Sequence, residues 1–314
     1  MVHQIKNVVI AGAGVMGASM ALLFAEYGYD VTIYDINEKA LWTGRENMKN
    51  ILVGDVKEGK KKEEEAQELV AKICFTSEKN CFCAADFVVE AIVERMEIKH
   101  DFWKEISSLV SEKAVLTSNT SGLSLTQIAE AVVNPERFCG MHWLNPPHIC
   151  PLVEVIKGEK TQDIVTDIVY DIARDIGRYP VRLKKEVPGF LVNRFQFAIL
   201  REATSLVEEG VAEKEDIDKV FKYGLGLRYA CLGPFEIADL GGLDTFYRIA
   251  EYLFPDLSNA AEVPKMLAEL YRCGDYGVKT GMGFYDYSGG RDEEVIAKRD
   301  HDFKKVAKCL YEEP

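Results

Sequence analysis

The chain has 314 residues, of which 47% are hydrophobic and 28% charged, and its formal net charge is −13. This length and composition are typical of a globular protein with one large or two ordinary domains and a substantial core. The acidic balance argues against nucleic acid and anionic membranes as partners, but a small anionic ligand stays possible because it needs only a few local donors.

The ends and the cysteines indicate where the chain works. No apolar run reaches membrane-spanning length, and the first residues, MVHQIKNVVIAGAG, lack the pattern of a signal peptide. The eight cysteines are scattered, which fits a reducing compartment where most serve as small buried hydrophobes. We therefore expect a cytoplasmic protein.

Up to about residue 187, β-rich runs alternate with helical stretches. The runs are VVIAGAG, DVTIYD, DFVVEAIV, AVLTSNTS, FCGMHW, PLVEVI and PVRLKK, and the helical stretches include 15–28, 95–110 and 162–177. Such alternation is typical of βαβ units around a mostly parallel sheet. The sequence predicts an α/β domain with a doubly wound sheet over residues 1–187.

A charged segment, GRENMKNILVGDVKEGKKKEEEAQELVAKI, separates the second run from the third. Its two amphipathic halves are interrupted by Gly54 and Gly59, which predicts a helical hairpin projecting from this domain over about residues 37–73. We interpret Lys57 and the lysines at 60–62 as a solvated face, with an anion site as the alternative.

From Pro188 onward the strand signals fade. Apolar residues recur at helical spacing in FLVNRFQFAILREATSLVEEG and IDKVFKYGLGL, and the segment after Gly290 has the pattern of a surface helix. We predict an all-helical domain over residues 188–314.

A glycine motif supplies the first chemical signal. Gly12, Gly14 and Gly17 form G-x-G-x-x-G between an apolar run and a helical one, where glycines permit close approach of a pyrophosphate to a helix N-terminus. Asp35 follows at the end of VTIYD, placed to accept both hydroxyls of an adenosine ribose and to repel a 2′-phosphate. The pattern predicts a Rossmann domain with NAD as the cofactor, and a turn that merely packs helix on strand is the alternative.

The stretch GMHWLNPPHICPLVEVI places polar side chains in an apolar setting. If FCGMHW and PLVEVI are neighbouring antiparallel strands, His142 and Glu154 lie side by side, and the carboxylate can hold one ring nitrogen while the other exchanges a proton with substrate. One alternative is a core histidine satisfied by a carbonyl. Another is a metal site made with Cys139, His148 and Cys150.

Several motifs together resemble the 3-hydroxyacyl-CoA dehydrogenase family. They are AGAGVMG, VVEAIVERMEIK, SNTSGLS, MHWLNPP followed by LVEVI, VPGFLVNR, GPFEIADLGGLDT and KTGMGFYDY. The resemblance implies an NAD-binding Rossmann domain, a helical C-terminal domain through which the chain forms a homodimer, and a substrate cleft between them. No metal is expected, since two prolines lie between the candidate ligands and no C-x-x-C pairing is present.

The resemblance also implies roles for individual residues. His142 would be the general base and Glu154 its partner, while Ser121 and Asn193 would hydrogen-bond the reacting end of the substrate. The cofactor would be held by Gly12, Gly14, Val15, Met16, Gly17, Asp35, Glu94, Lys99, Asn119 and Asn145.

Plainer interpretations exist for these carried-over residues. Ser121 can cap a helix that begins near Leu123, and Asn193 can cap the following helix or face solvent. Glu94 and Lys99, five apart on a helix, share no face and can be surface charges.

The implied reaction is the NAD-dependent oxidation of a 3-hydroxyacyl-CoA to the 3-ketoacyl-CoA, and its reverse. Family members that act on acyl-CoA commonly have a lysine shortly before LVE, where this chain has Pro151. This feature and GLGLRYACLGPFE are similar to relatives that oxidise free hydroxy acids, such as L-gulonate 3-dehydrogenase and carnitine dehydrogenase. A free 3-hydroxy acid is therefore the alternative substrate, and a protein that binds NAD without turnover is the alternative from another class.

Overall fold

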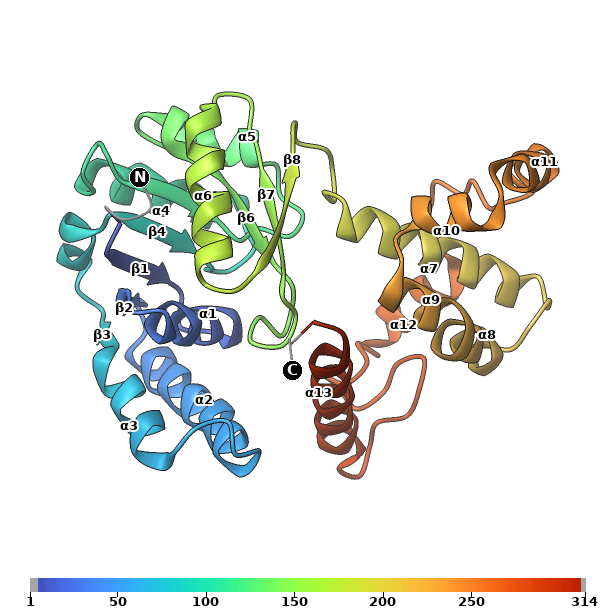
Figure 1. The fold of residues 1–314 in the computed structure, drawn as a ribbon, viewed down its shortest axis with the longest axis horizontal. Helices are drawn as coiled ribbons and strands as arrows, with labels where there is room; N and C mark the ends of the chain where they lie inside the picture. The colour runs from blue at the N-terminus through green and yellow to red at the C-terminus, as the bar shows by residue number, and fades with distance from the viewer. Residues whose placement is uncertain (1–4, 312–314) are drawn as a thin grey trace. The chain divides into compact units, whose positions relative to one another are not determined.

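A computed structural model describes residues 5–311, and the chain divides into two compact units after Asn193. Figure 1 shows the course of the chain through both units. The alternation of β-rich and helical segments predicted an α/β domain followed by a helical one. This prediction is confirmed, because all the named strands lie in the first unit.

The first unit is built on one sheet of eight strands in the order β3-β2-β1-β4-β5-β6-β7-β8. Neighbouring strands are parallel except for β6 and β7, which are antiparallel. The strands are β1 Asn7–Ala11, β2 Asp30–Tyr34, β3 Cys74–Thr76, β4 Phe87–Glu90, β5 Val115–Ser118, β6 Phe138–Trp143, β7 Leu152–Ile156 and β8 Tyr179–Leu183. The sequence pattern missed β3, since three residues are too few to show an alternation.

Helices cover both faces of this sheet, as expected of a doubly wound fold (Figure 1). They are α1 Val15–Glu26, α2 Glu38–Lys57, α3 Glu63–Lys72, α4 Met96–Leu109, α5 Leu125–Ile128 and α6 Asp163–Asp175, with short 3₁₀ turns at Lys79–Ala84, Ala129–Ala131 and Pro135–Arg137.

The side chains of β1 show how the two faces differ. Val8 and Ile10 join the core beneath α1 and α6, whereas Val9 joins the core beneath α4. Successive side chains of a strand point to opposite faces, so a strand buried on both sides becomes a continuous apolar run.

The charged segment after β2 forms α2 and α3. Gly59 has a φ of +72° and follows the end of α2, whereas Gly54 lies inside that helix, so the prediction that both glycines interrupt the helices was wrong for Gly54. Only a left-handed backbone conformation needs glycine, and a helical interior tolerates it at modest cost. The nitrogen of Lys60 lies 3.4 Å from Glu58 and that of Lys61 lies 2.8 Å from Glu26, so two of the lysines pair with carboxylates.

The second unit is helical throughout its named elements. It contains α7 Val192–Glu208, which begins at the end of the first unit, then α8 Lys214–Val220, the π-helical segment Phe221–Leu225, α9 Gly226–Cys231, α10 Pro234–Gly241, α11 Leu243–Leu253, α12 Lys265–Cys273 and α13 Arg291–Leu310. Helix α13 is the one predicted after Gly290. None of the helices within residues 5–311 combines the length and the apolar character needed to cross a bilayer.

The second unit leaves much of its apolar surface uncovered. Within residues 194–311 only Thr204 is buried. Large apolar side chains stand out instead, with 85% of Phe235, 79% of Tyr223 and 75% of Leu240 exposed. Where such side chains adjoin one another, they mark a contact site.

Candidate active site

The turn between β1 and α1 is built from glycines that admit no side chain. Gly12 has a φ of +107°, and a Cβ there would lie 2.4 Å from the carbonyl oxygen of Ala91. A Cβ on Gly17 would lie 1.9 Å from the carbonyl oxygen of Gly12. These two glycines are therefore required by the packing of helix, turn and strand alone.

Gly14 is different, because no atom lies within 4 Å of the position that its Cβ would take. It precedes the first turn of α1, which has no side-chain cap and no acidic residue. The first amides of a helix lack intrahelical partners, and an anion is stabilised there. The open space above this N-terminus, bordered by exposed Val15 and half-buried Met16, fits the pyrophosphate of a dinucleotide.

Asp35 follows β2 and connects to the same turn. Its Oδ2 accepts a hydrogen bond of 2.9 Å from the amide of Ala13, and its Oδ1 accepts one of 2.9 Å from the amide of Asn37. A carboxylate has about four acceptor positions, so it retains capacity for the ribose hydroxyls. The chain thus offers the parts that NAD requires, namely an open helix N-terminus and an acid at the end of β2.

His142 and Glu154 are direct partners across the antiparallel pair β6 and β7, as predicted from the sequence. Nδ1 of His142 lies 2.7 Å from Oε2 of Glu154, and the two side chains are 3% and 0% exposed. Oε1 of Glu154 accepts hydrogen bonds from the amides of Leu191, at 2.8 Å, and Val192, at 3.1 Å. Burial raises the pKa of Glu154, but the hydrogen bonds from His142 and the two amides outweigh it and hold the pKa below its usual value.

Ser121 and Asn193 complete a ring of contacts around His142. Oγ of Ser121 lies 3.2 Å from Nε2 of His142. Asn193 lies in the first turn of α7, and its side-chain nitrogen Nδ2 donates to the carbonyl oxygen of Ser121 at 2.7 Å. The helix cap near Leu123 comes from Ser124, whose hydroxyl accepts from the amide of Gln127. Ser121 is therefore exposed on the loop and directed at the imidazole, and it caps no helix.

Glu94 and Lys99 are paired with each other, which corrects the interpretation of them as separate surface charges. Glu94 precedes α4 instead of lying on it, and its Oε2 is 3.2 Å from Nζ of Lys99. Lys99 is 1% exposed and also donates to Glu90. The pattern of the sequence did not single out Glu90, because an acid at the end of the apolar run DFVVEAIV looks like an ordinary strand terminus.

The other oxygen of Glu94 holds the loop that carries Ser121. Oε1 accepts from the hydroxyl of Thr120 at 2.5 Å and from the amides of Ser121 at 2.8 Å and Gly122 at 3.2 Å. Burial raises the pKa of Glu94, but the bond from Thr120 and the charge of Lys99 hold it below its usual value. The charged carboxylate of Glu94 thus holds the loop of Ser121 through three hydrogen bonds.

Two asparagines lie in the loops on either side of β6. Asn119 accepts a hydrogen bond of 2.8 Å from the amide of Trp143 through its Oδ1. Asn145 is exposed and precedes Pro146 through a cis peptide bond. Asn119 is therefore tied to the strand that carries His142, while the side chain of Asn145 faces solvent.

The cysteine of this strand points away from His142. Cys139 is fully buried in the core beneath α1, because residues 139 and 142 lie on opposite faces of β6. Burial raises the pKa of its thiol, which opposes the thiolate form that binds metals. Within residues 5–311 no three side chains of the His, Cys, Asp and Glu types come together as metal ligands.

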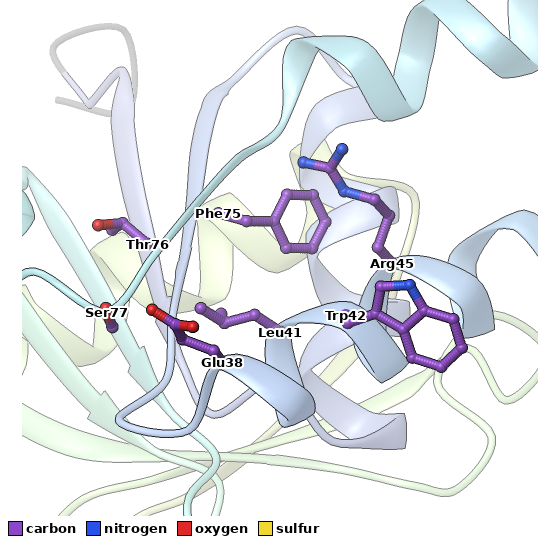
Figure 2. A pocket seen from close by; sticks show the side chains of 7 residues that line it. All are labelled: Glu38, Leu41, Trp42, Arg45, Phe75, Thr76 and Ser77. Carbon is purple, nitrogen blue, oxygen red and sulfur yellow. The ribbon is translucent and has the colours of Figure 1, made fainter.

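A surface pocket of about 420 Å³ lies between α2 and the edge strand β3 (Figure 2). Its lining includes Trp42, Phe75 and Arg45, whose guanidinium stands 4.4 Å from the Phe75 ring centre. The carbonyl of Thr76 in its wall accepts from the amide of Asp35 at 3.3 Å. The pocket therefore borders the turn of Asp35, and none of the residues around His142 lines it.

Family models match both parts of the chain. Residues 7–187 match the model described as 3-hydroxyacyl-CoA dehydrogenase, NAD binding domain, and residues 189–287 match the model of the C-terminal domain of the same family. The match identifies NAD as the cofactor of the first domain.

Individual relatives resemble the chain over nearly its whole length. A 5-formyl-3-hydroxy-2-methylpyridine 4-carboxylate 5-dehydrogenase of Mesorhizobium japonicum is 35% identical over 98% of this chain and 99% of its own. A probable 3-hydroxybutyryl-CoA dehydrogenase of Bacillus subtilis is 37% identical over 90% of this chain and 98% of its own. Among solved structures, a 5-formyl-3-hydroxy-2-methylpyridine 4-carboxylic acid 5-dehydrogenase, described as an NAD⁺-dependent dismutase, has a TM-score of 0.89 at 33% identity, covering 99% of this chain and 100% of that one.

Proposed function

Because the chain belongs to the 3-hydroxyacyl-CoA dehydrogenase family, we propose that it oxidises the 3-hydroxyl of a 3-hydroxyacyl-CoA to the 3-ketoacyl-CoA and catalyses the reverse reduction. The observation that supports this proposal is the line of contacts from Ser121 through His142 to Glu154. Such a line couples an exposed hydroxyl-binding position to a buried carboxylate, as proton removal from an alcohol requires.

The geometry of His142 determines which ring nitrogen can accept the proton of the substrate. With Nδ1 donating to Glu154, the neutral ring carries its lone pair on Nε2, which faces Ser121 and the exposed side of the loop. Nε2 takes the proton of the substrate hydroxyl, and Glu154 stabilises the imidazolium that results. NAD, when bound, accepts the hydride that leaves C3 of the substrate.

Ser121 and Asn193 orient the substrate in this proposal. The Ser121 hydroxyl is placed to hydrogen-bond the oxygen that loses its proton, because it already lies within 3.2 Å of Nε2. Asn193 fixes the loop by donating from its side-chain nitrogen to the Ser121 carbonyl. Holding the alcohol in near-attack geometry supplies a large part of such a rate enhancement.

A free acid of low molecular weight, bearing a hydroxyl or formyl group, is the second candidate substrate. It is supported by the similarity to the pyridine carboxylate dehydrogenase over nearly the whole chain. Lys60 and Lys61 are paired with Glu58 and Glu26, so the lysine-rich turn offers less positive charge to a CoA phosphate than its sequence suggests.

We also propose that the chain forms a homodimer through its second unit. The support is the unit's exposed apolar surface, since a helical domain whose described part buries one residue has no core sufficient for an isolated fold. Light scattering on the purified protein tests this proposal: a dimer that dissociates on Phe235→Asp supports it, and a folded monomer contradicts it.

One assay distinguishes the acyl-CoA substrate, the free acid substrate and NAD binding without turnover. NADH consumption with acetoacetyl-CoA is measured beside NADH production from free 3-hydroxy acids and carnitine, and beside both reactions with 5-formyl-3-hydroxy-2-methylpyridine 4-carboxylate. Turnover of acetoacetyl-CoA alone supports the acyl-CoA substrate, and turnover of a free acid alone supports the second candidate. Tight NAD binding with no turnover of any of them contradicts both and leaves a nucleotide-binding protein.

A further inference from the structure

A second buried acid lies behind the loop of Ser121. Glu90, the last residue of β4, is 0% exposed. Its Oε2 accepts from the hydroxyl of Ser118 at 2.7 Å and from the indole of Trp103 at 3.3 Å, and its Oε1 accepts from Lys99 and from the amide of Ile92 at 3.2 Å. Four donors from four positions of the chain fix this carboxylate, so it cannot move without disturbing β5 and α4.

Lys99 connects this fixed acid to Glu94. Its ammonium donates to Glu90 on one side and lies 3.2 Å from Oε2 of Glu94 on the other. Glu94 in turn holds Thr120, Ser121 and Gly122 through its other oxygen. The contacts therefore run without a gap from the interior of the sheet to the residue that touches His142.

We infer that Lys99 and Glu90 are positioning residues, which fix Ser121 against His142 by holding Glu94. The inference rests on the proposed function, since it assigns importance to Ser121 through the hydroxyl-binding step. Lys99 acts in this inference through Glu94, and its own side chain is 1% exposed.

The cost of burying Glu90 and Lys99 favours a functional role for this pair over a purely stabilising one. Removing the Glu90 carboxylate and the Lys99 ammonium from water is expensive, and well-packed apolar residues commonly stabilise a core as well or better. The Lys99 ammonium lies beside Glu94, which holds the loop of Ser121. An exposed acid at Glu94, with 42% of its side chain accessible, would by itself hold that loop loosely, because an exposed ion pair contributes little.

A double-mutant cycle tests the inference. Glu90→Gln with Lys99→Met removes both buried charges together, which avoids a lone buried charge that would prevent folding. We expect kcat to fall about tenfold, because the Ser121 hydroxyl is no longer held against His142. In a Ser121→Ala background the same pair of substitutions is expected to have little further effect, since the group they position is absent. The matched control is Lys79→Met, which removes an exposed Lys–Glu pair of the same domain and should leave kcat unchanged.

A spectroscopic measurement keeps the test independent of turnover. With ¹⁵N-labelled histidine, the Nε2 resonance of His142, assigned from His142→Gln, should shift in Glu90→Gln/Lys99→Met as it does in Ser121→Ala, and no further when both changes are combined. Additive losses of kcat in the two backgrounds, or an unshifted Nε2 resonance in the folded variant, would overturn the inference. An inactive wild-type protein whose resonance shifts as expected would count against the proposed function alone.

Discussion

Glu154 contacts two elements of the first unit: one carboxylate oxygen lies 2.7 Å from Nδ1 of His142, and the other accepts hydrogen bonds from the amides of Leu191 and Val192. The same acid thereby orients the imidazole and fixes the helix turn that presents Asn193 to the loop of Ser121. A carboxylate placed in this way stabilises an imidazolium, and here it also holds the start of α7 against the loop of Ser121.

The first prediction concerns His142. His142→Gln removes the base while keeping a polar side chain of similar size, so we expect kcat to fall by about a hundredfold or more with the NAD affinity largely retained. Steady-state kinetics and calorimetric titration of NAD measure the two quantities. His100→Gln, which alters a histidine bonded to the Gln127 carbonyl, is the control. Unchanged turnover in His142→Gln would refute the assignment.

The second prediction is the dependence of stability on pH through Glu154. Its pKa is lowered in the folded protein, so the folded state binds fewer protons than the unfolded state around the usual value of 4.5. The stabilisation is complete above that value and is lost as the pH falls through the folded pKa. Urea unfolding should therefore show wild type more stable than Glu154→Gln at about pH 7, with the difference unchanged down to about pH 4.5 and shrinking as the pH falls further. The exposed Glu159→Gln serves as the control; a gap that stays constant with pH would contradict the prediction.

The pairing of His142 with Glu154 was accessible from the sequence for a simple reason. Two apolar runs joined by a short proline-containing loop predict an antiparallel pair, and residues in register on such a pair face each other. The apolar runs of the parallel strands were equally plain, because strands covered on both faces are apolar at every position.

Glu90, Lys99 and Glu94 show what the sequence does not reveal. Lys99 lies on a charged helix and looks solvated, and its burial depends on the packing of α4 against the ends of β4 and β5. Contacts between such distant positions have no signature in local periodicity. The sequence motif located Ser121. The contacts that hold its loop come from distant positions of the chain and are seen only in the structure.

The third prediction separates two glycines of the turn after β1. Gly14→Ala meets open space and should fold with an unchanged Tm, while its methyl group intrudes where the pyrophosphate binds and weakens NAD by about fivefold or more. Gly17→Ala places a methyl group 1.9 Å from a carbonyl oxygen and should be strongly destabilised. Thermal unfolding with NAD titration distinguishes the two.

Gly224→Ala is the control for that pair, since its Cβ also meets no atom within 4 Å and it lies outside the turn. It should not lower the Tm, because alanine suits a helical position at least as well as glycine, and it should leave the NAD affinity unchanged. Full NAD affinity in folded Gly14→Ala would mean that the pyrophosphate does not bind at this helix N-terminus.

The last prediction concerns the choice between NAD and NADP. Asp35→Ala removes a carboxylate that is bonded to the glycine turn and faces the ribose position, so we expect weaker NAD binding and a smaller preference for NAD over NADP. The ratio of the two dissociation constants is the measurement, because a general loosening of the turn would weaken both cofactors and leave the ratio unchanged. Asp30→Ala removes the same charge from the other end of β2, where the acid pairs with Lys6 in solvent, and should not alter the ratio. Equal ratios in wild type and Asp35→Ala would show that another group of the chain sets the cofactor preference.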